Sequence, residues 1–159
     1  MITPDQKMWM TGGFYEGNLD STIFILIDGP SESGLNLPHE LSNHAILSIN
    51  ETLSLLIGGE NKELIVMDTT YYFSHETEKW TEGPHLNEPR MSHTAGLITD
   101  KVTKETFLIV VGGRKTHQYD SELNTTEMLM NGEWVSGGNL HLIFSIYDYS
   151  FISMIHDHK

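Results

Sequence analysis

Three stretches of this chain each end in a pair of adjacent glycines. The sequence reads LLIGG at residues 55–59 and VVGG at residues 110–113, and a related form, WMTGG, occupies residues 9–13. Counted between their first glycines, at positions 12, 58 and 112, the doublets are 46 and then 54 residues apart. Trp80 and Trp134 follow the second and third doublets and are also 54 residues apart. Landmarks that share one spacing indicate a structural unit that repeats about every 50 residues.

Each unit has the pattern of four short strands separated by turn residues. Apolar and β-branched residues cluster in runs of strand length, and no stretch has clear helical periodicity. Asn131-Gly132 and Asp28-Gly29 are typical of two-residue hairpin turns with positive φ at both positions. The strands expected in the second unit are 44–50, 52–59, 64–73 and 79–83, and those in the third are 91–99, 106–113, 125–130 and 133–137. The sequence therefore predicts an all-β chain of antiparallel meanders.

The second unit resembles the kelch repeat. Phe73 stands seven residues before Trp80, and Gly83-Pro84 follows the Trp. His44 and His93 recur at one position of consecutive units, 49 residues apart. In the kelch family an apolar strand ends in Gly-Gly, an aromatic residue precedes a Trp, and a Gly-Pro or Leu-Pro turn leads into the next unit. The resemblance implies a β-propeller with four-stranded antiparallel blades. Its landmarks here are Gly12, Gly13, Gly58, Gly59, Gly112, Gly113, Phe73, Trp80, Trp134, His44 and His93.

We interpret the glycine doublets as architecture rather than chemistry. Glycine tolerates positive φ and a close approach of another backbone, which the crowded inner end of a strand requires. The large Trp side chain is expected to pack as a wedge between adjacent sheets. The alternative, a loop that cradles a phosphate group, needs a helix after the glycines, and residues 114–122 (RKTHQYDSE) do not begin one clearly.

The repeat divides the chain into one partial and two complete kelch units. Residues 1–43 hold strands two to four of the first unit, with Ser31 in the Trp position. Residues 44–90 form the second unit and residues 91–140 the third, and residues 141–159 add the first strand of a further blade and a tail. This makes about three blades, whereas propellers usually have four to eight. We expect a fragment of a longer protein, with an open arc and a homodimer that completes a ring as alternatives.

In a four-stranded meander, the loop between the second and third strands leaves the same end as the linker to the next unit. The segments concerned are 14–21, 60–63, 114–124, 31–43, 84–92 and 137–142. Arginine and tyrosine are frequent anchors of protein interfaces, and Arg90 and Arg114 are the only arginines in the chain. The resemblance implies that this face binds a segment of a partner protein. The candidate residues are Tyr15, Asn18, Asn61, Arg90, Ser92, Arg114, His117 and Tyr119.

Other functions of propellers are less well supported by the residues. Galactose-oxidase-like enzymes hold copper with a Cys–Tyr cross-link, and this chain has no cysteine; sialidase-like enzymes use three arginines, and it has two. We expect structural hydrogen bonds at His44 and His93 and a solvated tail at His156-Asp157-His158, and so predict no metal, cofactor or catalytic residue. A second hypothesis is the substrate-recognition part of a kelch-type ubiquitin-ligase adaptor, conditional on the chain being a fragment.

Composition limits the partners of the chain. Its 22 acidic and 9 basic residues give a net charge of −13, which argues against binding to nucleic acid or an anionic membrane surface. Cysteine is absent, so disulfides and thiol chemistry are excluded. The N-terminus lacks the pattern of a signal peptide, which favours a cytoplasmic location. Two sequons, at Asn50 and Asn124, leave secretion open. The predicted partners are other proteins.

Overall fold

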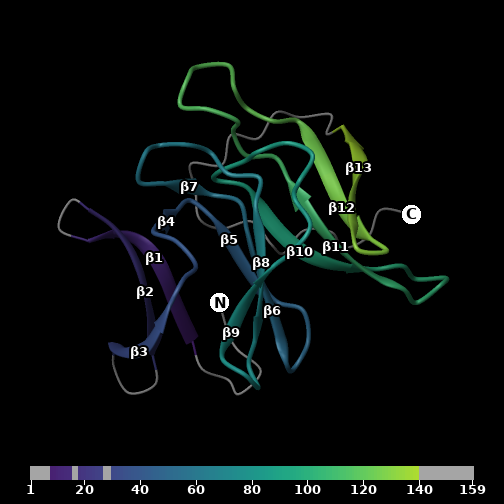
Figure 1. Ribbon diagram of the computed structural model, residues 1–159. Coiled ribbons are helices and arrows are strands. Elements are labelled where there is room, and N and C mark those ends of the chain that lie inside the picture. Colours follow the sequence, from purple (N-terminus) through teal and green to yellow (C-terminus); the bar gives the residue numbers. More distant parts are fainter. Residues whose placement is uncertain (1–7, 16–17, 27–29, 140–159) are drawn as a thin grey trace.

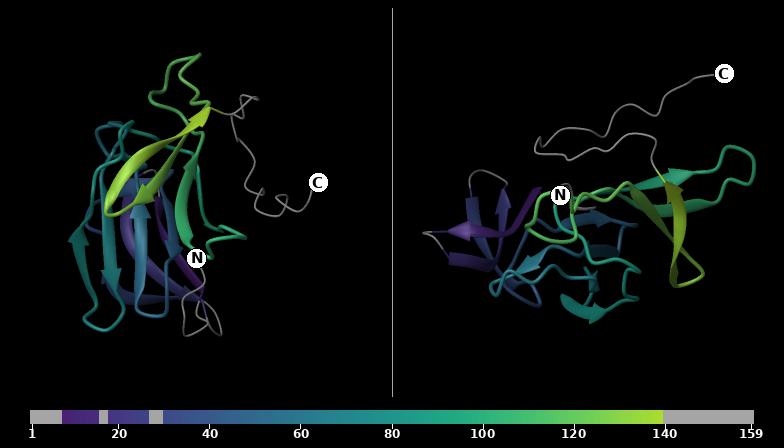
Figure 2. Two further views of the ribbon diagram at one scale, coloured as in Figure 1. Left: turned by 90° about the vertical axis from the view of Figure 1, so that its right-hand side faces the viewer. Right: turned by 90° about the horizontal axis from the view of Figure 1, so that it is seen from above.

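The computed structural model describes residues 8–15, 18–26 and 30–139 of the chain. This part is entirely β-structure and turns, without a helix, which confirms the predicted all-β class. The strands form three antiparallel meanders that follow one another along the chain and lie side by side (Figure 1). Seen from above, the three meanders keep their chain order across the molecule (Figure 2).

The first sheet has the order β1-β2-β3, the second β5-β6-β8-β9 and the third β10-β11-β12-β13. The strands of the first sheet are β1 (Met8–Tyr15), β2 (Asn18–Leu26) and β3 (Pro30–Asn36). Those of the second are β5 (Ala45–Ser48), β6 (Leu53–Ile57), β8 (Thr70–Ser74) and β9 (Lys79–Glu82). Those of the third are β10 (Thr94–Thr99), β11 (Thr106–Val111), β12 (Thr125–Met130) and β13 (Glu133–Asn139). Two short strands, β4 (Leu41–Ser42) and β7 (Glu60–Asn61), pair separately.

Several of the sequence-based boundaries are wrong. Residues 14–15 and 18–21, expected in a loop, belong to β1 and β2, and residues 138–139, also expected in a loop, belong to β13. Residues 31–36, expected in a loop, belong to β3. Residues 64–69, expected in a strand, belong to the loop before β8. The side chain of Asn61 accepts hydrogen bonds from the amides of Glu63 and Ile65, and Leu64 has a φ of 60°, so the backbone turns here. Local hydrogen bonding by Asn61 therefore overrides the strand preference of the apolar run.

The hairpin between β12 and β13 follows the sequence prediction. Asn131 and Gly132 have φ values of 53° and 83°, as a two-residue turn with positive φ at both positions requires. The other predicted turn, Asp28-Gly29, lies outside the described residues, as do the metal-like tail His156-Asp157-His158 and the further strand expected in residues 141–159.

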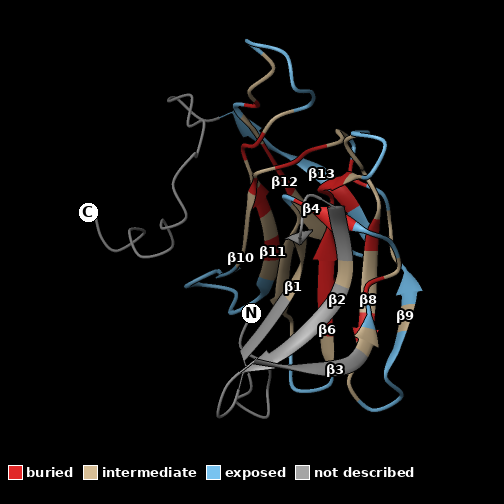
Figure 3. Cartoon of the chain, turned by 90° about the vertical axis from the view of Figure 1, so that its left-hand side faces the viewer, coloured by how far each residue is buried: buried red, intermediate tan, exposed pale blue. Residues whose placement is uncertain are grey.

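Apolar side chains from successive sheets and linkers pack together in two clusters. Buried residues lie on inner strands such as β6 and β11 (Figure 3). Leu37 and Leu41, from the segment after the first sheet, pack with Leu56 and Phe73 of the second. A second cluster joins the second and third sheets and contains Leu55, Ile57, Leu86, Leu108, Val110 and Trp134. The second sheet therefore contributes its two faces to different clusters, as the alternation of side chains along a strand requires.

Each Trp landmark lies on the last strand of a sheet and forms a hydrogen bond with the part of the chain that leads into that sheet from the previous one. The Trp134 indole N–H donates to the carbonyl oxygen of Pro84 at 3.0 Å, and its ring lies in the second cluster. The Trp80 indole N–H donates to the carbonyl oxygen of Asn36 at 2.8 Å, and its ring centroid is 4.9 Å from that of Phe73. The predicted wedge between adjacent sheets is confirmed for Trp134, and Trp80 is the half-buried counterpart.

The glycine doublets lie where another backbone approaches closely. Gly58 and Gly113 have φ values of 53° and 92°. A Cβ at Gly58 would lie 2.5 Å from the carbonyl oxygen of Arg90, and one at Gly113 would lie 2.6 Å from that of Met91. Both positions therefore exclude a side chain on conformational and steric grounds. The interpretation of these doublets as architecture agrees with this geometry.

Candidate functional site

Four segments gather at one end of the three sheets, which we call the loop end (Figures 1 and 3). They are the linkers 37–44 and 83–93 and the loops 58–69 and 112–124. Strand β4 pairs with β7, which joins the first linker to the first loop. The Met91 and Arg114 backbones bond to each other in both directions, at 3.0 and 2.9 Å, and join the second linker to the second loop. The Ser92 amide donates to the Asn43 carbonyl at 2.8 Å and joins the two linkers.

A buried carboxylate connects the two loops at this end. Glu60 is 2 % exposed, and its Oε1 accepts hydrogen bonds from the Ser42 hydroxyl at 2.9 Å and the Asn43 amide group at 2.6 Å. Its Oε2 lies 2.7 Å from Nε2 of His117, whose side chain is half exposed. His117, a predicted binding residue, is thereby held against the neighbouring loop with one side of its ring open to solvent.

Arg90, predicted to be a surface anchor, is completely buried. Its exposed fraction is 0 %. Nη1 donates to the Gly112 carbonyl at 2.8 Å, and Nη2 donates to Oε1 of Glu127 at 2.8 Å. The prediction for Arg90 is therefore wrong, because the guanidinium crosses from the linker into the third sheet and serves as a structural tie.

Glu127 is the acceptor that organises this linker. Its Oε2 accepts from the backbone amide and the side-chain amide of Asn87, at 2.7 and 2.8 Å. Its Oε1 accepts from the Glu88 amide at 3.2 Å as well as from Arg90. Charge-assisted bonds of this kind are among the stronger ones in proteins. A single side chain on β12 thus holds three residues of the 83–93 linker, Asn87, Glu88 and Arg90, a role that sequence reasoning missed.

Glu88 continues the network to the surface. It pairs with the Lys115 ammonium and accepts a hydrogen bond from the Thr125 hydroxyl at 2.6 Å. Burial by itself would raise the pKa of Glu88, but Lys115, Thr125 and the nearby Arg90 outweigh it and hold the pKa below its ordinary value. Glu88 is therefore a charged group that closes the gap between the second linker and the 112–124 loop.

Arg114 stabilises its own loop. Its Nη2 donates to the Gln118 carbonyl at 3.0 Å and lies 3.6 Å from Oε1 of Glu122. Its side chain is 15 % exposed, so only an edge of the guanidinium reaches solvent. In contrast, Tyr119 at the tip of the same loop is 94 % exposed. Of the aromatic and basic candidates whose side chains the structure describes, Tyr119 is the one presented most fully to solvent.

The remaining candidates have mixed positions. Asn61 lies in β7 and holds the turn that follows it, and Ser92, with a φ of 52°, lies in the linker beside Asn43. Tyr15 and Asn18 pair across the β1–β2 hairpin, and their side chains lie outside the described part of the chain. The structure thus brings Asn61, Ser92, Arg114, His117 and Tyr119 to one end of the molecule.

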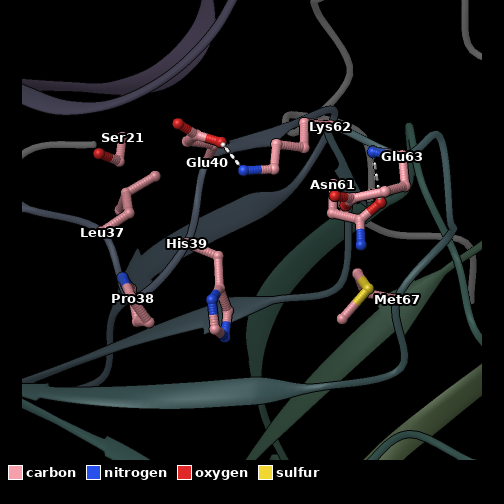
Figure 4. A pocket seen from close by; sticks show the side chains of 9 residues that line it. All are labelled: Ser21, Leu37, Pro38, His39, Glu40, Asn61, Lys62, Glu63 and Met67. Carbon is pink, nitrogen blue, oxygen red and sulfur yellow. Dashed lines mark hydrogen bonds and ion pairs between the residues drawn. The ribbon is translucent and has the colours of Figure 1, made fainter.

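A cleft opens at the loop end between the first linker and the 58–69 loop (Figure 4). Its volume is about 410 Å³, within the range of sites that bind small molecules. Leu37 and Met67 supply apolar surface, and an ion pair of 3.2 Å between Lys62 and Glu40 lies at its edge. The full lining is Ser21, Leu37, Pro38, His39, Glu40, Asn61, Lys62, Glu63 and Met67. Sequence reasoning placed the segments of all these residues except Met67 on this face, but it singled out Asn61 alone, because the shape of the cleft depends on how the segments pack.

The two repeated histidines lie beside the glycine doublets. Nε2 of His44 is 2.9 Å from the Thr11 hydroxyl, as a structural hydrogen bond requires. Neither ring nitrogen of His93 has a hydrogen-bond partner in the described part of the chain, so the structural hydrogen bond expected at that residue is not found. Burial lowers the pKa of His44 to about 4. Burial, with the positive charge of Arg90 nearby, lowers the pKa of His93 to about 3. Both rings are therefore neutral in the folded protein near neutral pH.

From the lowered pKa values of these two histidines we predict that the free energy of unfolding falls in mild acid. Unfolding returns each ring to its ordinary pKa of 6.5, so below that pH the unfolded state binds protons that the folded state does not. Stability should be fully present above about pH 6.5 and fall as the pH is lowered toward 4, by up to about 1.4 kcal/mol per pH unit for each ring. Urea unfolding at a series of pH values measures this slope. The variant His93→Gln should show a shallower slope, and an unchanged slope would contradict the assignment.

Within the described residues, no three His, Cys, Asp or Glu side chains are grouped so that they could hold a metal ion. The same part of the chain has no helix long and apolar enough to cross a membrane. No model of a known protein family matches the chain, and no curated protein matches it either.

Proposed function

We propose that the chain is a kelch-type β-propeller segment and acts as a non-catalytic module that binds a partner protein at the loop end. The proposal of a propeller is supported by the succession of antiparallel sheets, each with the same glycine doublet, linked by segments that pack between neighbours. The kelch resemblance of the second unit adds the expectation that loops carry the function.

One observation carries the proposal of binding: loops from different sheets form a cross-linked surface with a cleft and a projecting aromatic side chain. The Glu60–His117 and Glu88–Lys115 pairs join the loops to each other and to the linkers. Surfaces that are ordered before binding lose less conformational entropy when a partner docks. Tyr119 projects from this surface, and tyrosine is a frequent anchor of interfaces.

The chemistry of the loop end suggests the type of partner segment. The cleft combines apolar surface from Leu37 and Met67 with the carboxylates of Glu40 and Glu63 and one lysine, Lys62. The chain as a whole has a net charge of −13. Opposite charge steers association. We therefore propose an extended peptide with basic residues and one apolar side chain that enters the cleft.

Selection of peptides from a displayed random library on the purified chain tests this proposal. We expect enriched peptides to carry Lys or Arg beside a large apolar residue. Their affinity for the Tyr119→Ala variant should be weaker by about tenfold, the effect of about 1.4 kcal/mol. Calorimetry or fluorescence anisotropy measures the change.

The matched control is Val102→Ala, at a residue 89 % exposed in the turn between β10 and β11, at the opposite end of the sheets. Its affinity for the selected peptides should equal that of the parent chain. Selected peptides whose binding depends on Val102 and not on Tyr119 would place the binding surface elsewhere and reject the loop end.

A further inference from the structure

The third sheet has an apolar face that belongs to neither core cluster. We call it the outer face and define it by Ile98, Phe107, Ile109, Val111, Met128 and Val135. Strand register places these residues together, because Ile98 lies opposite Phe107 and Met128 lies opposite both Ile109 and Val135. Residues that lie directly opposite in paired strands point to the same side. None of the six is part of the two clusters of buried apolar residues in the described chain.

The opposite face of the same sheet is already occupied. Leu108 and Val110 alternate with the outer-face residues along β11 and pack, with Trp134, against the second sheet. The outer face is left with two apolar side chains well exposed to water, Ile98 at 40 % and Val135 at 37 %. A contiguous apolar face of this kind on a soluble protein marks a surface for association.

The second sheet shows what such a face is built to contact. Leu55 lies three residues before Gly58, and Ile57 lies one residue before it. Ile109 and Val111 lie at the same distances before Gly112, so the two pairs are equivalent. Leu55 and Ile57 are covered completely by the next sheet, through Leu108, Val110 and Trp134, and by Leu86 of the linker. The outer face of the third sheet repeats the covered face of the second, one unit further along the chain.

We propose that the outer face is a self-association surface, which receives the first sheet of a second copy of this chain. The contact between the second and third sheets has a direction, because Leu55 and Ile57, from the strand that ends in the glycine doublet, face the sheet that follows. A contact between copies on the same pattern is head-to-tail, so it closes into a ring when the geometry allows and otherwise extends as an open chain of molecules. This inference uses the repeat of sheets and does not depend on peptide binding at the loop end.

Light scattering on the full chain over a range of concentrations tests the proposal. We expect a mass that rises to an integer multiple of the chain mass. The variants Ile98→Glu and Val135→Glu place a charge on the outer face at positions that already reach solvent, so both should fold, as a thermal melt will verify. Each should raise the dissociation constant by at least about tenfold, because a charge would be buried without a partner.

The matched control is Val102→Glu, the same apolar-to-acidic change in the turn beyond β10, which should associate like the parent chain. A parent chain that stays monomeric at all concentrations would overturn the proposal. Removal of residues 140–159 that turned such a monomer into an associating form would identify that segment, rather than a second copy, as the occupant. Equal weakening by Ile98→Glu and Val102→Glu would also overturn it, because the effect would then follow charge alone.

Discussion

Replacing Arg90 by alanine is expected to lower the free energy of unfolding by about 3–5 kcal/mol. The substitution leaves the Glu127 carboxylate, with a side chain 3 % exposed, inside the protein without its cation. It also removes the hydrogen bond to the Gly112 carbonyl, which ties the linker to the third doublet. Equilibrium unfolding in urea measures the loss. By comparison, Lys62→Ala breaks an exposed ion pair with Glu40 and should cost no more than about 1 kcal/mol.

The junction between the first and second sheets offers a way to test this assignment further. The carbonyl oxygens of Leu41 and Arg90 each face the first glycine of a doublet, so the two residues are equivalent. Tyr71 lies opposite Leu56 as Glu127 lies opposite Val110. The junction between the first and second sheets thus has Leu41 and Tyr71 at the positions where the junction between the second and third sheets has the ion pair of Arg90 and Glu127. Pro38 precedes Asn87 by 49 residues, the same spacing as between Leu41 and Arg90. The first junction therefore has a proline, which has no amide proton, at the position where the Asn87 amide donates to Glu127 in the second junction.

A triple variant should therefore recover much of the stability that Arg90→Ala loses. Asn87→Pro, Arg90→Leu and Glu127→Tyr together copy the first junction into the second and leave no buried charge. Buried ion pairs can often be replaced by packed apolar residues without a net loss of stability. A triple variant that is less stable than Arg90→Ala would show that the two junctions differ in more than these side chains.

Gly58→Ala is expected to destabilise the fold by at least about 2 kcal/mol. Alanine at a φ of 53° pays the cost of a left-handed backbone, about 1–2 kcal/mol. Its Cβ would in addition lie 2.5 Å from the carbonyl oxygen of Arg90, which belongs to a backbone held on both sides. A calorimetric melt should show a fall in Tm. Because the carbonyl is fixed by the Gly59 amide at 2.9 Å, little relaxation is available.

Gly96→Ala is the matched control for this prediction. Gly96 lies in β10, has no positive φ, and a Cβ there would meet no atom within 4 Å. Alanine should be neutral or stabilising by about 0.5 kcal/mol, because glycine in a strand has the larger entropy cost of folding. If both alanine variants lost similar stability, the loss at Gly58 could not be assigned to the close approach of the linker.

The sequence predicted the elements of this fold better than its polar contacts. Strand β12 and the Asn131-Gly132 turn follow from local patterns, because they depend on residues adjacent in the chain. The loop at 64–69 was missed, since one side chain, Asn61, redirects the backbone. The position of Arg90 could not be predicted, because its partner Glu127 is 37 residues away and the pairing depends on how two sheets face each other.

For the candidate site, too, the sequence predicted what depends on strand order and missed what depends on tertiary packing. That the loops share one end follows from the alternation of strands in a meander, so several candidates were placed together correctly. Which of them reach solvent depends on tertiary packing: Tyr119 does, Arg114 reaches it only in part, and Arg90 does not. The cleft was not predicted, because one of its apolar residues, Met67, was expected in a strand and its packing near Leu37 depends on the turn at Asn61.

The linker of residues 83–93 is bonded on both sides, which has a consequence for how its amide protons exchange with solvent. Irregular segments usually exchange rapidly, because their amides face water. Here the amides of Asn87 and Glu88 donate to Glu127 in the third sheet, whereas that of Arg90 donates to the Met67 carbonyl in the 58–69 loop of the second meander. A local unfolding event that is confined to one of these partners does not break the hydrogen bonds of all three amides. Deuterium uptake in this linker should therefore be as slow as in the strands and should report the separation of the two sheets.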